Sequence, residues 1–336
     1  ALLMPAGHDV VIVGAGPAGS TLAWKLREAG LDVLLMDKRS FPRDKTCAGW
    51  VTPAVMQELA IDPGDYGRGN TLQPIHRFRV GMVDGAPPVL TPQSAAPLSY
   101  GIRRCEFDDY LFRRAGATAL EGTPVKSLVR DGEGWLINGG IRARLVVGAG
   151  GHFCPVARTL GADLGKGELA VAAQEVEFRM SADQAAACPC EPQVPELYFC
   201  ADLKGYGWIF RKGDWLNVGL GKTDTHRLGD QVQQFCDGLV RAGRLPADLP
   251  AKFKGHAYLL YAHSPRPLVT DAALTIGDAA GLAYTQSGEG IRPAVESALL
   301  AARHILAAGG DYRAERLAGY GEAISERFGT RGRAPA

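Results

Sequence analysis

A glycine-rich turn near the start of the chain has the spacing of a nucleotide-binding site. Gly14, Gly16 and Gly19 form a G-x-G-x-x-G pattern directly after the apolar run Asp9–Val13. In such a pattern the first glycine permits a tight turn, the second lets a pyrophosphate approach the backbone, and the third lets a helix pack closely on the strand. The N–H groups at the start of the helix then face the phosphates. The chemistry expected of these residues is the binding of a dinucleotide.

Asp37 supplies the acid that this fingerprint requires. It stands at the end of a second apolar run, Asp32–Met36, 23 residues after Gly14. This separation is near the ~20 residues expected in a dinucleotide-binding unit. A carboxylate at this place accepts hydrogen bonds from ribose hydroxyls. The alternative is a glycine turn in a nucleotide-free α/β protein, which the order of strand, helix and acid disfavours. The pattern alone does not distinguish NAD from FAD.

A second glycine-rich region lies far downstream. Gly277-Asp278 follows a short apolar run, and Gly288–Ile291 precedes a long one. Both segments resemble the second nucleotide motif of FAD enzymes with the p-hydroxybenzoate hydroxylase fold. The resemblance implies that Asp278 bonds the ribityl chain of FAD and that backbone N–H groups of Gly288–Ile291 meet the flavin N1–C2=O edge. A helix N-terminus stabilises the negative charge that a reduced flavin carries there. Two such motifs favour FAD, because NAD dehydrogenases do not need the second.

Three further segments resemble the geranylgeranyl reductase family of FAD-dependent oxidoreductases. Phe41–Gly49 is similar to the family's P-x-x-K-x-C-G-G segment, Arg103–Leu111 to its D-R-x-x-F-D-x-x-L segment, and Gly205–Phe210 to its G-Y-x-W-x-F-P segment. The resemblance implies that Arg104 contacts FAD and that the loop around Cys47–Gly49 lies near the isoalloxazine ring.

The chain departs from the family's pattern at three places. Ala48 replaces a glycine, Arg211 replaces a proline, and Gly150-Gly151 stands where Asp-Gly is usual. In the hydroxylases that aspartate assists flavin and nicotinamide contacts, so its absence weakens the case for NADPH. FAD is therefore the expected cofactor, and NAD(P)H is retained only as a candidate electron donor.

The glycine turns and the resemblance together predict one set of FAD-contacting residues. The expected set is Gly14, Gly16, Pro17, Ala18, Gly19, Asp37, Lys38, Cys47, Ala48, Gly49, Arg104, Val125, Gly150, Gly277, Asp278, Gly288, Gly290 and Ile291. Arg43 and Lys45 are expected either to meet phosphate or substrate charge or to lie in a solvated loop.

Substrate-facing residues are expected in two segments. Cys47 is a candidate catalytic acid, with a buried small residue as the alternative, since free cysteine is often buried. Tyr206, Trp208 and Phe210 alternate along a predicted strand and so share one sheet face. They are expected to line the substrate pocket, and a packed core face is the alternative. No metal site is expected, because Cys188-Pro-Cys190 has neither a second pair nor a nearby histidine.

Composition limits the partners. Of the 336 residues, 46% are hydrophobic and 22% are charged, and the net charge of +1 gives no field for steering nucleic acid. Seven cysteines in a chain of this length favour a reduced, cytoplasmic setting over a disulfide scaffold. No apolar run approaches the ~20 residues that span a bilayer. Contact with a membrane surface and the oligomeric state are left open.

The elements that must position these residues begin with a βαβ unit. It is expected over Asp9–Val13, Ala18–Ala29 and Asp32–Met36, with Gly30 ending the helix. Further strands are expected at Ile75–Val83, Pro97–Ile102, Val125–Val129, Trp135–Ile137, Ile141–Val147, Val171–Met180, Glu196–Cys200, Gly205–Phe210, Trp215–Leu220 and Ala273–Ile276. Further helices are expected at Pro53–Ala60, Phe107–Ala115, Gln231–Ala242, Ile291–Ala308 and Tyr312–Phe328, and a loop from Asp62 to Pro74.

The expected fold class is α/β, a Rossmann-type FAD-binding domain with an inserted antiparallel β-sheet substrate domain. The FAD-binding domain is expected over residues 8–75, 101–168 and 266–330, the last part including C-terminal helices. The substrate domain is expected over residues 76–100 and 169–265.

The expected function is that of an FAD-dependent oxidoreductase. The family resemblance implies reduction of a carbon–carbon double bond in a small, apolar, isoprenoid-like substrate, with hydride from reduced flavin and a proton from water or Cys47. An FAD-dependent aromatic monooxygenase or a related halogenase-like enzyme of the same fold is the alternative, although Tyr206, Phe210 and Arg211 break the halogenase W-x-W-x-I-P pattern. A nucleotide-binding protein without catalysis is a third hypothesis.

Overall fold

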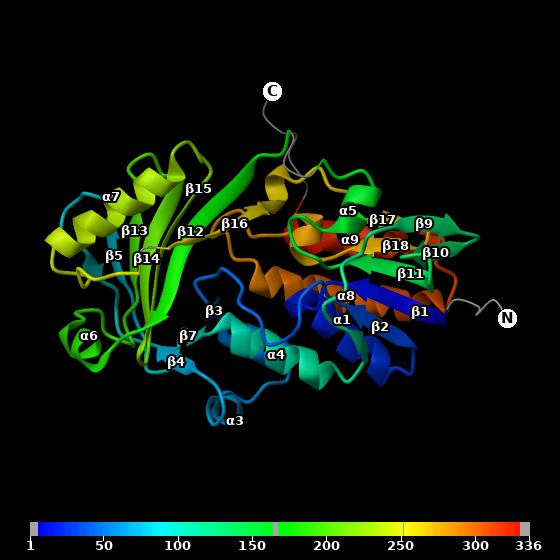
Figure 1. Cartoon of the computed structure of the whole chain (residues 1–336), viewed down its shortest axis with the longest axis horizontal. Helices are drawn as coiled ribbons and strands as arrows, with labels where there is room; N and C mark the ends of the chain where they lie inside the picture. Colours follow the sequence, from blue (N-terminus) through cyan, green and yellow to red (C-terminus); the bar gives the residue numbers. More distant parts are fainter. Residues whose placement is uncertain (1–5, 164–166, 251, 330–336) are drawn as a thin grey trace. The chain divides into compact units, whose positions relative to one another are not determined.

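The computed structural model describes residues 6–163, 167–250 and 252–329. The chain forms two compact units (Figure 1). Unit 1 comprises Ala1–Arg43, Asp108–Ala170 and Tyr258–Ala336, and unit 2 comprises Asp44–Phe107 and Val171–Ala257. The first segment of unit 1 ends at Arg43, whereas the first segment of the expected FAD-binding domain ends at residue 75. That one domain binds the cofactor and the other binds the substrate stays a prediction.

Unit 1 is built on an eight-stranded sheet with the order β17-β18-β11-β1-β2-β8, and a β9–β10 hairpin attached to β11. Its strands are β1 (Ala6–Val13), β2 (Val33–Met36), β8 (Thr118–Leu120), β9 (Leu128–Asp131), β10 (Gly134–Ile137), β11 (Ile141–Gly148), β17 (Val269–Thr270) and β18 (Ala273–Thr275). The path from β18 through β11, β1 and β2 to β8 is parallel. Val10, Val11 and Ile12 are fully buried, as expected of a central parallel strand covered on both faces.

Helices cover the sheet of unit 1. They are α1 (Pro17–Glu28), α5 (Pro155–Thr159), α8 (Ile291–Ala308), α9 (Ala314–Phe328) and, from Asp108 onward, α4 (Arg104–Ala115); a short 3-10 helix, η2, covers Gly277–Ala280. α1 packs on α8 (Figure 1). Leu22 and Leu26 of α1 and Ala298 and Ala301 of α8 are fully buried, and the small alanines allow a close approach. Gly30, with φ of +87°, follows the end of α1 as expected.

Unit 2 contains a seven-stranded sheet with the order β16-β12-β15-β14-β13-β5-β6 and a three-stranded sheet with the order β3-β7-β4. The larger sheet consists of β5 (Arg79–Met82), β6 (Val89–Leu90), β12 (Ala170–Arg179), β13 (Glu196–Phe199), β14 (Gly205–Lys212), β15 (Trp215–Lys222) and β16 (Lys254–Leu259). The smaller sheet consists of β3 (Trp50–Val51), β4 (Leu72–Ile75) and β7 (Ser99–Ile102), and the helices are α2 (Pro53–Glu58), α3 (Pro63–Gly67), α6 (Ala182–Ala187) and α7 (Leu228–Arg241).

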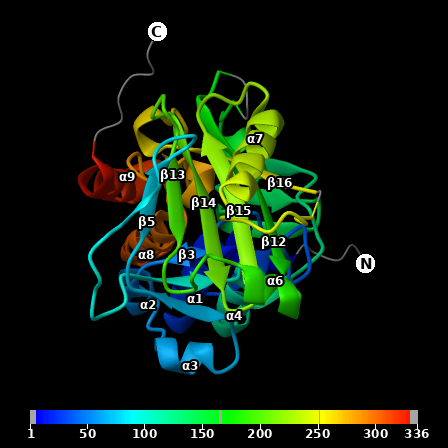
Figure 2. The same ribbon diagram turned by 90° about the vertical axis from the view of Figure 1, so that its left-hand side faces the viewer.

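The larger sheet has two different faces. One face is apolar and carries α7, which lies in front of β15 in Figure 2. Ile209 and Val218 from the sheet pack there against Val232 and Phe235 of α7. Side chains on β12, β14 and β15 alternate, so the opposite face carries a different set that includes the functional candidates of unit 2.

Several expectations about local structure are corrected. The expected loop from Asp62 to Pro74 contains α3 and most of β4, because Asp62 is an N-cap that accepts the N–H of Asp65 and Pro63 follows it. The expected strand Ile75–Val83 is two strands, β4 and β5, which belong to different sheets. The strand expected at Val125–Val129 begins only at Leu128.

The sheet expected from Val171 onward is confirmed as antiparallel over β12, β15, β14 and β13, but β13 also pairs in parallel with β5. In the ranges that the structure describes, no helix is both long and apolar enough to cross a membrane.

Candidate functional site

The first glycine turn of unit 1 joins β1 to α1 and is closed by contacts that require glycine. Gly14 has φ of +110°, and a Cβ there would collide with the carbonyl oxygen of Ala149. A Cβ on Gly19 would collide with the carbonyl oxygen of Gly14. The backbone of Gly150 also lies against Gly14, 2.6 Å from such a Cβ. The turn is therefore as tight as its spacing predicts.

The side of this turn at Gly16 is open and positively charged. The described atom nearest to a Cβ on Gly16 is Nη2 of Arg43, at 3.5 Å. Gly16 is the N-cap of α1 and offers no side chain to its first-turn N–H groups. Nη1 of Arg43 forms an ion pair with the fully buried Asp108, at 3.0 Å from Oδ2. A held guanidinium beside an uncapped helix N-terminus fits the pyrophosphate of a dinucleotide.

Asp37 is fixed at the end of β2. Its Oδ2 accepts the N–H of Ala15 at 2.9 Å, and its Oδ1 accepts the N–H of Arg39 at 2.9 Å. A carboxylate oxygen has two acceptor positions, so each oxygen retains one for a ribose hydroxyl. The neighbouring Lys38 is exposed. The structure thus places the acid next to the glycine turn, as the ribose-binding role requires.

The second glycine region lies beside the first one within unit 1. A Cβ on Gly277 would lie 3.1 Å from the Cβ of Ala18 in the first turn of α1. The N–H of Gly277 donates to Oγ of Ser297 on α8 at 3.0 Å. A Cβ on Gly290, the N-cap of α8, would lie 3.2 Å from Oδ1 of Asp278. Two segments from opposite ends of the sequence therefore converge around the starts of α1 and α8.

A buried cation that the sequence analysis missed holds the second turn. Nη1 of Arg266 donates to the carbonyl oxygens of Asp278 and Ala279, at 3.3 Å each. Its other nitrogens donate to Glu168, with Nε at 2.8 Å from Oε1 and Nη2 at 3.0 Å from Oε2. The side chains of Arg266 and Glu168 are almost fully buried. The pair is distant in sequence, and no local pattern marks it.

In unit 2 the Cys47–Gly49 loop is tied to the polar face of the larger sheet. Gly49 has φ of +72°, and a Cβ there would collide with the carbonyl oxygen of Ile102. Nζ of the buried Lys212 donates to that same oxygen at 2.8 Å. The N–H of Gly49 contacts Sγ of Cys47 at 3.4 Å. The family's second glycine is thus required here for steric reasons, whereas Ala48 occupies the first position.

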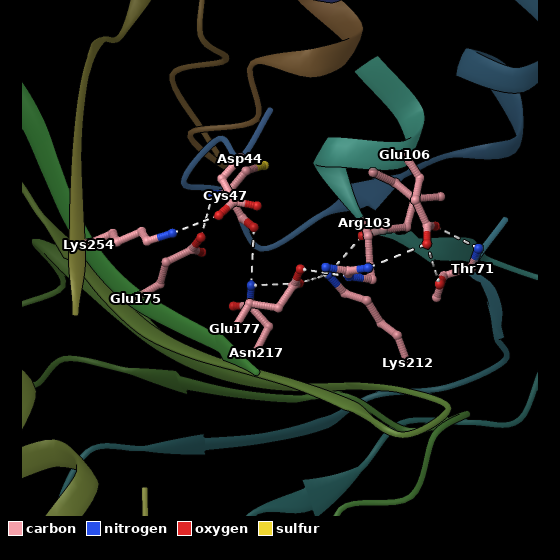
Figure 3. A network of polar contacts seen from close by, with 11 residues as sticks. Asp44, Cys47, Thr71, Arg103, Glu106, Glu175, Glu177, Lys212, Asn217 and Lys254 are labelled. Carbon is pink, nitrogen blue, oxygen red and sulfur yellow. Dashed lines mark hydrogen bonds and ion pairs between the residues drawn. The ribbon is translucent and has the colours of Figure 1, made fainter. Parts of the chain in front are cut away.

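A network of polar side chains extends from this loop (Figure 3). The N–H of Cys47 donates to Oε1 of Glu175 at 2.6 Å, and the carbonyl oxygen of Cys47 accepts Nδ2 of Asn217 at 3.2 Å. Oε2 of Glu177 accepts from Nδ2 of Asn217 at 3.1 Å and from Nζ of Lys212 at 2.7 Å. Both the N–H and the carbonyl oxygen of Cys47 are therefore held by side chains of the sheet. Burial raises the pKa of Glu175 to about 7.

The three aromatic candidates share the face of this network, as expected from their alternation. Trp208 and Phe210 are buried with Ala173, and Tyr206 is half-buried against the same cluster. Nε1 of Trp208 donates to Oδ1 of Asn217 at 2.7 Å. Their role in lining a substrate pocket stays a prediction.

The expected cofactor set is distributed over both units. Within unit 1 the structure brings together Gly14, Gly16, Ala18, Gly19, Asp37, Gly150, Gly277, Asp278 and Gly290. Cys47, Ala48, Gly49 and Arg104 belong to unit 2, with Arg104 opening α4. Val125 lies in the loop before β9, and Gly288, with φ of +70°, lies against Tyr258. The contacts of these residues with FAD stay predictions.

Comparisons with known proteins agree with the fold and the first motif. A model of the NAD(P)-binding Rossmann-like domain matches residues 12–51, which include Gly14 and Asp37. Among solved structures, a geranylgeranyl bacteriochlorophyll reductase-like protein from Thermoplasma acidophilum matches with a TM-score of 0.81 at 22% identity, over 96% of this chain and 84% of that one. A halogenase in complex with FAD matches with a TM-score of 0.76 at 16% identity, over 96% of this chain and 74% of that one. These likenesses establish the fold.

Sequence relatives narrow the family. Menaquinone reductase of Mycobacterium tuberculosis is 30% identical over 317 residues, which cover 88% of this chain and 75% of that protein. Digeranylgeranylglycerophospholipid reductase 3 of Methanosphaera stadtmanae is 28% identical over 347 residues, which cover 96% of this chain and 83% of that protein. With both nucleotide motifs brought together in one unit, this chain belongs to the geranylgeranyl reductase family of FAD-dependent oxidoreductases.

Proposed function

We propose that this protein reduces a carbon–carbon double bond in the isoprenoid chain of a lipid. When bound, FAD supplies, in its reduced form, the hydride that one alkene carbon accepts. The contact between Gly277 and Ala18 is the observation that carries the cofactor part of this proposal, because it shows that the two glycine turns are adjacent, as the binding of one FAD molecule would require. The relatives named for digeranylgeranylglycerophospholipid and menaquinone support an isoprenoid lipid as the substrate class.

Residues of unit 1 would hold the cofactor. The first-turn N–H groups of α1 after Gly16, together with the Arg43 guanidinium, would bind the pyrophosphate. Asp37 would accept from the ribose, and Asp278 from the ribityl chain. The N-terminus of α8 at Ile291 would stabilise negative charge at the flavin N1–C2=O edge.

Residues of unit 2 would receive the substrate. Tyr206, Trp208 and Phe210 offer an aromatic face that excludes water from an apolar chain. Cys47 is held beside that face by Glu175 and Asn217. Because the proposed substrate is a lipid, we also propose that the protein is cytoplasmic and contacts a membrane surface peripherally.

A reductive single-turnover experiment tests the function. The purified holoprotein is reduced with dithionite or with NADPH under anaerobic conditions and mixed with geranylgeraniol, which has no quinone ring that could itself oxidise the flavin. The expected result is reoxidation of the flavin only when the prenyl compound is present, with a product that gains two hydrogens per double bond. NADPH is retained as a donor only if it bleaches the flavin.

Other outcomes would contradict the proposed function. A product that gains an oxygen atom, and only in the presence of O₂, would identify a monooxygenase. A flavin that stays reduced with every prenyl probe would favour a protein without this catalysis.

A further inference from the structure

Glu175 occupies a central position on the polar face of the larger sheet. In the antiparallel ladder Glu175 of β12 is paired with Gly219 of β15, and Gly219 is paired with Trp208 of β14. Residues paired in this way point to the same face. A Cβ on Gly219 would collide with the indole ring of Trp208, so this ring covers the glycine. Glu175 and Trp208 therefore stand on one sheet face, on either side of Gly219.

The two oxygens of Glu175 have different surroundings. Oε1 accepts the N–H of Cys47 at 2.6 Å. Oε2 is buried, and no partner for it is present among the described residues. The whole residue is only 5% exposed. A buried carboxylate oxygen without a partner is unfavourable, and a carboxyl group in this position holds its proton more tightly.

Charged groups around Glu175 do not remove this effect. Burial is the largest influence and raises the pKa of Glu175 to about 7. The Cys47 N–H, Lys212 and the Asn217 side chain lower this pKa, and the charge of Glu177 raises it. Strand β16 lies next to β12, and two of its residues contact the loop that leads to Cys47. Nζ of Lys254 forms an ion pair with Asp44 at 2.8 Å, and Nδ1 of His256 contacts Nζ of Lys45 at 2.7 Å. Burial thus keeps Glu175 partly protonated near neutral pH.

Glu177, two residues along the same strand face, provides the contrast. Its Oε2 is bonded to Lys212 and Asn217, and its Oε1 is 3.4 Å from Nε of Arg103. Both oxygens are thus occupied, and Glu177 is the counter-ion of a buried lysine. Glu175 has the oxygen without a hydrogen-bond partner among the described residues, and its strand position shares a sheet face with the predicted substrate-facing aromatic residues.

We propose that Glu175 is the acid that protonates the substrate double bond, an inference that rests on the proposed function. One alkene carbon forms a C–H bond with the hydride from reduced flavin. The π-electron pair forms the second C–H bond with the proton on Oε2 of Glu175, and the O–H bond breaks. The alkene gains two electrons, the flavin loses two, and the Glu175 carboxylate recovers its proton from water. In this proposal Cys47, which the sequence analysis gave as a candidate catalytic acid, has a structural role in the Cys47–Gly49 loop instead.

The decisive variant is Glu175→Gln, because glutamine keeps the volume and an acceptor for the Cys47 N–H but has no acidic proton. Glu177→Gln is the matched control on the same strand face. Carboxyl titration is followed in the oxidised holoprotein by infrared difference spectroscopy. A carboxyl that titrates near pH 7 is expected in the wild type. It is expected to persist at a lower pH in Glu177→Gln, because the charge of Glu177 raises the pKa of Glu175, and to be lost in Glu175→Gln.

Single-turnover oxidation of the dithionite-reduced holoprotein by a prenyl probe is the second readout. Glu175→Gln is expected to lower the rate at least ~100-fold with unchanged FAD content. The wild-type rate is expected to fall as the pH rises through about 7, and Glu175→Asp to restore part of the rate together with a pH dependence. A wild-type rate and pH profile in Glu175→Gln would overturn the assignment and leave the proposed function intact. A wild type that reduces no prenyl probe would overturn the proposed function itself.

Discussion

Gly277 packs against Ala18, although the two residues stand at opposite ends of the chain: a Cβ on Gly277 would lie 3.1 Å from the Cβ of Ala18. This contact joins the turn after β18 to the first turn of α1. The N–H of Gly277 also donates to Ser297 of α8. One glycine thereby links both helix N-termini that are expected to face FAD, which makes it a sensitive test position.

Replacement of Gly277 by alanine is expected to reduce FAD retention. The added methyl group would crowd Ala18, and φ of +60° adds a backbone penalty of about 1 kcal/mol. Gly139→Ala is the matched control, since Gly139 has φ of +68° with open space around its Cβ position. Gly139→Ala carries only the backbone penalty, so Gly277→Ala should lose more thermal stability, and only Gly277→Ala should lose bound FAD, measured by absorbance after gel filtration. Equal FAD content in both variants would show that the contact between Gly277 and Ala18 is not needed for cofactor binding.

Arg43→Gln is expected to weaken FAD binding about tenfold, because a charge-assisted contact to phosphate is lost. It should also destabilise the protein by about 3 kcal/mol, since the fully buried Asp108 loses this ion pair. The double variant Arg43→Gln with Asp108→Asn should recover most of that stability while its FAD affinity stays low. Calorimetric titration of the apoprotein and thermal melts measure the two effects. Recovery of FAD affinity in the double variant would show that Arg43 acts only through folding.

Stability should depend on pH through Glu175. Its pKa is about 7 in the folded protein and 4.5 for an ordinary glutamic acid, so the folded state binds more protons between these values. The stabilising contribution of the bound proton is therefore complete below pH 4.5 and is lost as the pH rises through 7. The difference corresponds to about 3 kcal/mol.

Thermal melts of the wild type and of Glu175→Gln across this pH range measure the effect. The wild type should lose stability relative to the variant as the pH rises, and the difference should level off above pH 7. Parallel curves for the two proteins would contradict a raised pKa at Glu175.

Gly49→Ala should damage unit 2, whereas Ala48→Gly should be tolerated. A methyl group on Gly49 would collide with the carbonyl oxygen of Ile102 and crowd Nζ of Lys212, at a cost of about 3 kcal/mol. Ala48→Gly restores the residue that the family usually has and removes only a methyl group from a half-buried position. Denaturant unfolding compares the two variants. A tolerated Gly49→Ala would show that the loop can move away from β7.

Local patterns foresaw much of unit 1. The helix expected at Ile291–Ala308 has those bounds as α8, and β1, α1 and β2 lie within three residues of the expected limits. These elements are long, apolar and bounded by glycine, so local signals determine them. The parallel pairing of β13 with β5 was not foreseeable, because it joins segments that lie far apart in sequence.

The candidate site was foreseeable where a motif carries it. The glycine turns and Asp37 follow from spacing, but Arg266 and Glu168 form a buried pair with no local signature. Glu175 had a signal that was not used: Glu175 and Glu177 alternate with Val176 in a mostly apolar strand, which puts both carboxyls on one sheet face. Only the tertiary contacts show that Lys212 pairs with Glu177 and that Oε2 of Glu175 has no hydrogen-bond partner among the described residues.

Titration of the apoprotein with FAD, followed by flavin fluorescence, tests most directly whether the two glycine turns form one cofactor site. The expected result is saturation at one FAD per chain, with weaker binding in Gly277→Ala than in Gly139→Ala. A protein that is isolated colourless and takes up no FAD, or one that binds FAD equally well in both variants, would contradict it.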